Sequence, residues 1–222
     1  MILSACLLFR SAWANGACKI KKGAESMSCD CKNSFCNALD DNIRCYLCEH
    51  SVKISQPARS LDRAAERTDQ LEIVESGLLM SGLPSEDGVM QLTCLIYPGC
   101  LVGTRYVIDA SADLPKMEIK ALVQTTKCII PIKIARELFV SNPQFRELII
   151  KKHIELSETM INYVWLAYKK GPDKVRYVWD LLTQYGVTDF NQITYDDLAT
   201  ISGVSRITVA RAMKEILSEQ LD

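Results

Sequence analysis

The sequence has almost no net charge, only two histidines and no hydrophobic run long enough to span a membrane. Because the formal net charge is −1, a general basic coat for nucleic acid is excluded, and any DNA affinity must come from a local patch. The sequence also lacks a pocket-forming pair of carboxylates, a serine–histidine–aspartate set and a glycine-rich phosphate loop. We therefore expect a protein that is not an enzyme, in which His153 is packed or solvated rather than a haem ligand.

The N-terminal segment, residues 1–26, shows no clear hydrophobic period. Its apolar start is similar to a weak signal peptide, but no basic residue precedes the apolar run, the run is short, and Arg10 ends it. We interpret this segment as a poorly ordered extension of a cytoplasmic protein that has no membrane partner.

The middle of the chain, from about residue 56 to residue 131, consists of short apolar segments separated by turn signals such as Asp87-Gly88. Many short strands at near-regular spacing are typical of a small β-barrel or β-sandwich. A cysteine-rich stretch precedes them, so residues 27–140 are predicted to form a cysteine-rich segment and a β-barrel sensor domain. The expected fold class is α+β, with a jelly-roll-like barrel, a long helix and a C-terminal helical domain.

A long helix is predicted for residues 141–170, beginning at Asn142-Pro143 and stopped by Gly171-Pro172. Two adjacent apolar stripes run along it with spacings of three and four, the rhythm of a coiled coil. We expect one stripe to pack on the barrel and the other on the same helix of a second subunit; the alternative is a helix buried wholly within one subunit. The stripe assigned to the dimer interface is Ile149, Leu156, Met160, Tyr163 and Ala167.

The second stripe lies beside the first on the same helix and is the one expected to pack on the barrel. Its members are Ile150, Ile154, Ile161, Val164 and Tyr168.

The C-terminal segment, residues 171–222, contains the pattern of a helix–turn–helix that reads DNA. Thr194 is predicted to cap the first helix together with Asp197, and Gly203 can take the left-handed conformation of a tight turn. Ser205 is a suitable N-cap for the second helix, and Val209 falls on its inner face. The alternative is an ordinary helical hairpin; against it, the outward face carries groups able to bind phosphates or bases, namely Arg206, Thr208, Arg211 and Lys214.

The order of barrel, long helix and helix–turn–helix resembles the Crp/Fnr family of bacterial transcription regulators, whose barrel is of the cyclic-nucleotide-binding type. The resemblance covers roughly residues 28 to 220. It is carried by four motifs: Leu71–Gly77 is similar to the family's L-Y-I-V-x-S-G, Tyr97–Gly103 to x-P-G-D-x-x-G, Lys174–Leu182 to the helix before the DNA reader, and Asp197–Arg211 to the helix–turn–helix.

This resemblance implies a dimeric, sequence-specific transcription regulator whose partners are double-stranded DNA and RNA polymerase. It places Ser205, Arg206 and Arg211 where family members contact phosphates and bases. Ile207 stands where many relatives have a glutamate that reads cytosine. Because isoleucine cannot accept a hydrogen bond from a base, the preferred operator is expected to differ there, with contact to a thymine methyl as one option.

Two departures from the family pattern bear on function. Gly103 is followed by Thr104 instead of glutamate, and residues 111–117 supply a single cation, Lys116, instead of the arginine that grips a cyclic phosphate. Cyclic AMP is therefore not expected as the ligand. The sequence ends at Asp222, before the family's β-hairpin wing, so the alternative function is a sensor or ligand-binding protein whose DNA-binding domain is truncated, weak or non-functional.

The ten cysteines are not expected to form structural disulfides in a cytoplasmic chain. The spacing Cys29-x-Cys31-x₄-Cys36 is similar to the cysteine cluster of the oxygen-sensing Fnr branch, with each gap one residue shorter, and Cys128 is placed like that branch's fourth ligand. The resemblance thus implies an iron–sulfur cluster on Cys29, Cys31, Cys36 and Cys128, whose loss would alter operator affinity.

Other interpretations of the cysteines stay open. Cys45 and Cys48 form a C-x-x-C pair, so the metal could be zinc held by local thiolates. The group could also be a reversible dithiol switch, or simply reduced side chains that pack as small apolar residues without any metal. The remaining cysteines are interpreted as structural or incidental: Cys6, Cys18, Cys94 and Cys100.

Overall fold

The computed structural model describes residues 20–23, 26–29, 33–62, 69–84, 90–111, 117–187 and 192–219. The predicted N-terminal extension therefore lies largely outside the described residues. Where its backbone is described, β1 (Ile20–Gly23) pairs with β2 (Ser26–Cys29) in an antiparallel hairpin, so this end of the segment has regular structure that its sequence did not predict.

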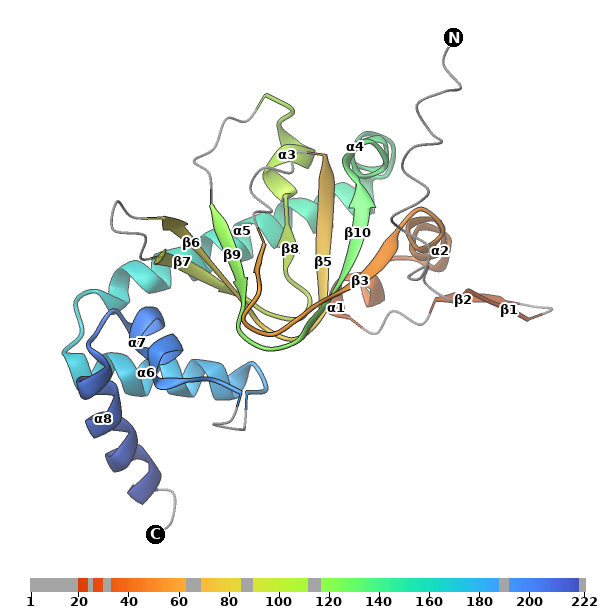
Figure 1. Ribbon diagram of the computed structural model, residues 1–222. Coiled ribbons are helices and arrows are strands. Elements are labelled where there is room, and N and C mark those ends of the chain that lie inside the picture. Colours follow the sequence, from red (N-terminus) through yellow and green to blue (C-terminus); the bar gives the residue numbers. More distant parts are fainter. Residues whose placement is uncertain are drawn as a thin grey trace.

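The centre of the molecule is a pair of four-stranded antiparallel sheets that face each other (Figure 1). Apart from the consecutive pair β6–β7, neighbouring strands in both sheets come from distant parts of the chain, as in a jelly roll. The predicted antiparallel barrel and the α+β class are confirmed. The first sheet has the order β3 (Val52–Gln56), β10 (Thr125–Pro131), β5 (Gln70–Ser76), β8 (Leu101–Val102), and the second β4 (Leu61–Asp62), β9 (Glu118–Ala121), β6 (Leu79–Pro84), β7 (Met90–Ile96).

The turn after β8 depends on a glycine. Gly103 has φ +90°, and a Cβ on it would lie 2.6 Å from the carbonyl oxygen of Gln70 on the neighbouring β5. A side chain at this position would therefore strain the backbone and collide with the sheet. The turn starts the short helix α3 (Thr104–Ile108), which places Thr104 inside the barrel.

The cysteine-rich stretch folds into two short helices, α1 (Ser34–Asn37) and α2 (Asp41–Glu49), that pack beside the first sheet (Figure 1). Phe35 of α1 is fully buried, and its ring meets Phe145 edge to face, with 6.1 Å between the ring centroids. The same apolar cluster takes in Leu71 of β5 and Ile130 of β10. The segment before the barrel is thus part of the barrel's own core.

The long helix α5 (Pro143–Leu166) follows α4 (Ile132–Ser141) and crosses the barrel. The predicted start is confirmed, and Asn142 caps the helix by accepting a hydrogen bond from the backbone N–H of Phe145 at 2.7 Å. Its end was predicted too late: α5 stops at Leu166, and Gly171-Pro172 begins the next helix. Proline suits the first turn of a helix as well as the region after one, so the dipeptide alone does not separate the two cases.

The structure contradicts the prediction of which α5 stripe is free to meet a second subunit. The side chains assigned to the dimer interface pack inside their own subunit: Ile149 is 0% exposed, while Leu156, Met160 and Tyr163 lie half-buried against the barrel. Only Ala167, just past the helix end, is exposed. Helical periodicity defines the stripes, but it does not say which of them the barrel covers. The exposed apolar side chains are those of the second stripe and its neighbour: Ile150, Ile154, Ile161, Val164, Trp165 and Tyr168.

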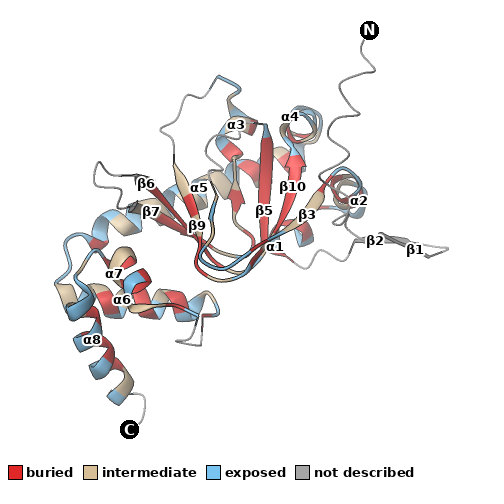
Figure 2. Cartoon of the chain, in the orientation of Figure 1, coloured by how far each residue is buried: buried red, intermediate tan, exposed pale blue. Residues whose placement is uncertain are grey.

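The C-terminal domain is a three-helix unit made of α6 (Gly171–Gln184), α7 (Tyr195–Ser202) and α8 (Arg206–Glu219). Each helix turns a buried face to the other two and an exposed face outward (Figure 2). Val178, Leu198, Val209 and Met213 are each 0% exposed in the shared core. Among the described residues, no helix is long and apolar enough to cross a membrane.

Candidate nucleic-acid interface and sensor pocket

Local hydrogen bonds cap the start of α7 and the start of α8, and a glycine forms the turn between the two helices. Thr194 Oγ1 accepts from the backbone N–H of Asp197 at 3.1 Å, and the Asp197 carboxylate accepts from the backbone N–H of Thr194 at 3.1 Å. Gly203 ends α7 with φ 64° and ψ 36°, and Ser205 Oγ accepts from the backbone N–H of Thr208 at 3.2 Å. The caps and the left-handed turn predicted from the sequence are confirmed.

The outward face of α8 collects the predicted DNA-reading residues. Ile207 is 66% exposed, and Val209 closes the core beneath this face. Thr208 differs from its neighbours: it is half-buried, and its hydroxyl lies 3.0 Å from Ser205 Oγ within the cap. The predicted residues whose side chains stay exposed are Ser205, Arg206, Ile207, Arg211 and Lys214.

Arg206 carries one contact that could compete with DNA. Its Nε lies 3.5 Å from a carboxylate oxygen of Asp196 on α7, with both side chains about 70% exposed, at 69% and 71%. An ion pair this open to water is weak, because solvent screens it. The guanidinium is therefore available to a phosphate or a base.

The helix–turn–helix unit is tied to the barrel by an ion pair that the sequence did not reveal. Lys120 Nζ of β9 donates to Asp197 Oδ1 at 2.8 Å, and the Asp197 side chain is only 4% exposed. Burial alone would raise the pKa of Asp197, but hydrogen bonds from Lys120 and Thr194 outweigh it, so the pKa lies below its usual value. One carboxylate thus caps the first helix of the motif and joins that helix to the sensor domain.

Aromatic and aliphatic contacts extend this junction. The rings of Tyr97, from the turn after β7, and Tyr185, at the end of α6, are stacked with 4.0 Å between centroids and 13° between planes. Leu78 and Leu95 of the barrel share one apolar cluster with Trp179 and Ile201 of the C-terminal domain. The two domains therefore share a continuous core and are not joined by α5 alone.

A pocket of about 410 Å³ lies between the two sheets and α5. Most of its walls are aliphatic, for example Ile119, Leu156 and Met160. Thr104 Oγ1 and His153 Nδ1 lie 3.0 Å apart across it, so His153 is packed, as expected. Burial, with a smaller effect of nearby Arg105, lowers the pKa of His153, which favours the neutral ring at pH 7.

Glu72, which lines this pocket, belongs to a buried and mutually paired group of charges. Lys127 Nζ, 0% exposed, lies 2.8 Å from both Asp62 and Glu72 carboxylates. Gln70 Nε2 donates to Glu72 at 2.6 Å. This group has two negative charges and one positive charge, so its field does not favour an anion. Lys116, the single cation predicted near a phosphate position, lies outside the described residues.

Two of the predicted iron–sulfur ligands lie in the same apolar cluster. Cys36 of α1 and Cys128 of β10 are 3% and 2% exposed and belong to the same apolar cluster. The side chains of Cys29 and Cys31 lie outside the described residues. Among the side chains that are described, no three His, Cys, Asp or Glu residues are grouped to hold a metal ion.

The remaining cysteines give one correction. Cys48 is disulfide-bonded, against the expectation of no disulfides, and in that state it is not a thiolate ligand for zinc beside Cys45. Cys94 and Cys100 are set in the barrel, where burial raises the pKa of both thiols, that of Cys94 to about 11. Such thiols are protonated at pH 7 and unreactive, which suits packing residues.

Comparison of the sequence with protein-family models and with curated proteins gives no match. The fold does match solved structures. FixK2 from Bradyrhizobium japonicum has a TM-score of 0.64 at 14% identity, over 77% of this chain and 86% of that protein. The c-di-GMP-responsive global regulator CLP from Xanthomonas campestris has 0.59 at 19%, over 78% and 89%.

A third structure, a CRP-family transcriptional regulator from Thermus thermophilus, gives a TM-score of 0.60 at 11% identity, over 76% of this chain and 86% of that one. At these identities the comparison establishes a shared fold. Barrel, long helix and helix–turn–helix domain are thus arranged here as in transcription regulators of the Crp/Fnr type.

Proposed function

We propose that this chain is a dimeric, sequence-specific DNA-binding transcription regulator of the Crp/Fnr type, with RNA polymerase as its protein partner. The observation that carries the proposal is the helix–turn–helix unit, in which Gly203 and Ser205 join two capped helices and α8 presents Arg206, Arg211 and Lys214 to solvent. A helix supported in this way can enter the major groove with its first turn against the base edges.

The position of Ile207 supports a base preference different from that of glutamate-containing relatives. Its side chain is 66% exposed in the first turn of α8, between the exposed Arg206 and the cap residue Thr208. An aliphatic side chain there can contact the methyl group of a thymine but cannot accept from a cytosine amine. The expected operator half-site therefore has thymine where those relatives select a G·C pair.

Selection from a pool of random DNA duplexes tests the proposal. The full chain, purified without oxygen, is expected to enrich a site with two-fold symmetry, because a symmetric dimer reads two equivalent half-sites. If no symmetric sequence is enriched while the barrel remains folded, the regulator proposal is wrong. The alternative, a sensor or ligand-binding protein with a weak DNA-binding domain, is then favoured.

Replacement of Arg206 by alanine should weaken operator binding by about 1–3 kcal/mol, the cost of losing a guanidinium that contacts a base or phosphate. Fluorescence anisotropy with the selected duplex measures the change. Arg176→Ala is the matched control, because Arg176 is paired with Glu219 on the domain surface away from the turn. Equal affinity of Arg206→Ala and the parent protein would mean that α8 does not enter the groove by its first turn.

The dimer part of the proposal rests on the exposed stripe of α5. Its large apolar side chains, including Ile154 and Ile161, are exposed along one face at coiled-coil spacing. A second copy of the same helix would cover them and would set two α8 helices side by side for adjacent half-sites.

The signal is proposed to reach the barrel as a redox or oxygen change or as a small molecule, and not as cyclic AMP. Thr104 stands where cyclic-nucleotide binders have a glutamate, and the buried carboxylates near Glu72 oppose a phosphate. The pocket beside Thr104 and His153 suits a compact, mostly apolar ligand with one hydrogen-bonding group.

For the redox signal, we propose that Cys29, Cys31, Cys36 and Cys128 hold an iron–sulfur cluster. The common burial of Cys36 and Cys128 in one apolar cluster fits such a group, because thiolates in dry surroundings are its usual ligands. A bound cluster would supply an oxygen-sensitive centre. Cys36 shares an apolar cluster with Phe145 of α5, and the adjacent Phe35 meets the Phe145 ring, so a change at Cys36 would reach the long helix through Phe35.

Iron and sulfide analysis of anaerobically purified protein tests the cluster. The parent protein should be coloured and contain both elements, and Cys128→Ser should lose most of the iron and the visible absorption. Cys100→Ser is the control, because Cys100 lies elsewhere in the barrel and should leave the colour unchanged. A colourless, iron-free parent protein would overturn the cluster, and its zinc content would then test zinc or no metal at all.

A further inference from the structure

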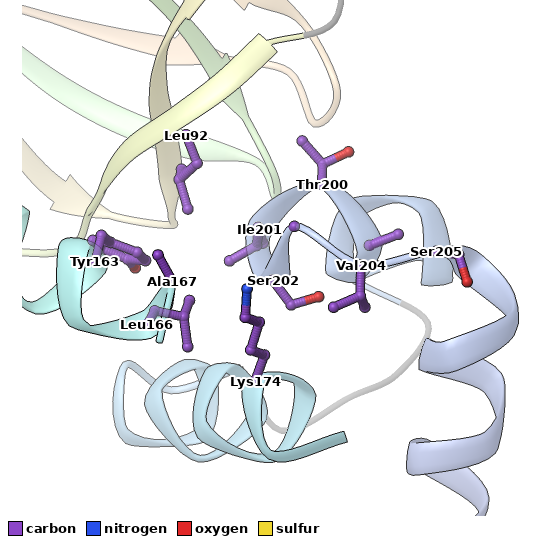
Figure 3. A pocket seen from close by; sticks show the side chains of 12 residues that line it. Leu92, Tyr163, Leu166, Ala167, Lys174, Thr200, Ile201, Ser202, Val204 and Ser205 are labelled. Carbon is purple, nitrogen blue, oxygen red and sulfur yellow. The ribbon is translucent and has the colours of Figure 1, made fainter. Parts of the chain in front are cut away.

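A second cleft, separate from the barrel pocket, opens where α5 meets the DNA-binding domain (Figure 3). Its volume is about 570 Å³, and none of the residues that line it lines the barrel pocket. The barrel contributes Leu92, α5 contributes Tyr163 and Leu166, and the helix–turn–helix contributes Ile201 and Val204. It is thus bordered by the sensor domain, the long helix and the DNA-reading motif together.

The walls of this junction cleft are mainly aliphatic and aromatic. Leu166 and Ile201 are almost fully buried behind it, and Leu92, Tyr163 and Val204 present partly exposed apolar surface to it. Water in contact with this surface would be released by an apolar group of matching size.

One cation points into the cleft. The side chain of Lys174 rises from α6 between Leu166 and Ser202, as Figure 3 shows. Across the described part of the chain, no carboxylate lies within ion-pair distance of Lys174, whereas Lys120 and Arg176 each have one. A cation on a half-buried lysine beside apolar walls favours an anionic group in the space before it, since the attraction is screened less than in open water.

We propose that the junction cleft binds a small amphipathic carboxylate. The apolar body of the ligand packs on Leu92, Tyr163 and Ile201, and its carboxylate accepts a hydrogen bond from Lys174. Because the cleft is bordered by both domains, the bound ligand fixes how the helix–turn–helix lies on the barrel. The resulting change in operator affinity rests on the proposed regulator function; the binding itself does not.

Calorimetric titration of the full chain in the absence of DNA tests the site, with 3-phenylpropionate as probe and 3-phenyl-1-propanol as its uncharged counterpart. The carboxylate is expected to bind more tightly than the alcohol. Lys174→Gln should weaken the carboxylate about ten-fold, as for loss of a charge-assisted hydrogen bond, and leave the alcohol unchanged. Lys133→Gln, an exposed lysine of α4, is the control and should change neither.

A second variant tests the location of the ligand site without changing its charge. Ala167→Phe adds a ring at the edge of the cleft and should abolish binding of both probes while the protein stays folded. The proposal is overturned if the carboxylate does not bind, or if it binds equally well to Lys174→Gln or to Ala167→Phe. If the probes bind as expected but the protein binds no DNA duplex, the ligand site in the junction cleft is supported and the regulator proposal is wrong.

Discussion

The double replacement Ile154→Asp and Ile161→Asp should convert the protein from a dimer into monomers. Both side chains lie more than half exposed on one face of α5, at 52% and 56%. In a dimer they would be buried, and two aspartates there would place unpaired charges in an apolar seam. Sedimentation equilibrium measures the change in mass. Operator affinity should fall about 100-fold or more, because a monomer engages one half-site at a time.

Asn162→Asp is the control for this experiment. It adds the same charge to an exposed position at the edge of the stripe and should leave the protein dimeric. The monomeric variant should still fold, since the replaced side chains are solvent-exposed in the single subunit, and its unfolding temperature should fall only by the stabilisation that the dimer contact supplied. Dimers that persist with aspartate at both positions would show that the subunits meet elsewhere.

The elements that could be predicted from sequence are those set by neighbouring residues. The cap at Thr194, the left-handed turn at Gly203 and the inward position of Val209 depend on side chains within one or two helical turns. The alternation that marks the strands is equally local, which is why the barrel was predictable.

Features that depend on distant parts of the chain were missed. Lys120 and Asp197 are separated by 77 positions, and Asp62 and Lys127 by 65, so no spacing rule connects them. Lys127 did carry a signal: it is a lysine next to the apolar run Cys128-Ile129-Ile130, and a charge there needs buried partners. The wrong prediction of which α5 stripe the barrel covers has the same origin, because the choice depends on where the barrel lies.

The ion pair between Lys120 and Asp197 makes the junction of sensor and DNA-reading domains dependent on one carboxylate. Asp197→Ala should lower the stability of the C-terminal domain by about 2–4 kcal/mol, from the lost helix cap together with the broken, largely buried pair. Lys120→Ala keeps the cap and breaks only the contact to the barrel. Hydrogen exchange of the α7 amides should therefore rise strongly in the first variant and less in the second.

The same carboxylate gives the junction a defined pH dependence. The pKa of Asp197 is lower in the folded protein than in the unfolded chain, so the folded state binds fewer protons on it. Its stabilisation is complete above the unfolded pKa of about 3.9 and is lost as the pH falls through the lower, folded value. Unfolding measured from pH 6 down to pH 3 should show this loss in the parent protein and a flatter profile in Asp197→Ala. Asp196→Ala, an exposed neighbour, should retain the parental profile; if it flattens the profile equally, the effect belongs to the helix end in general and not to the contact with Lys120.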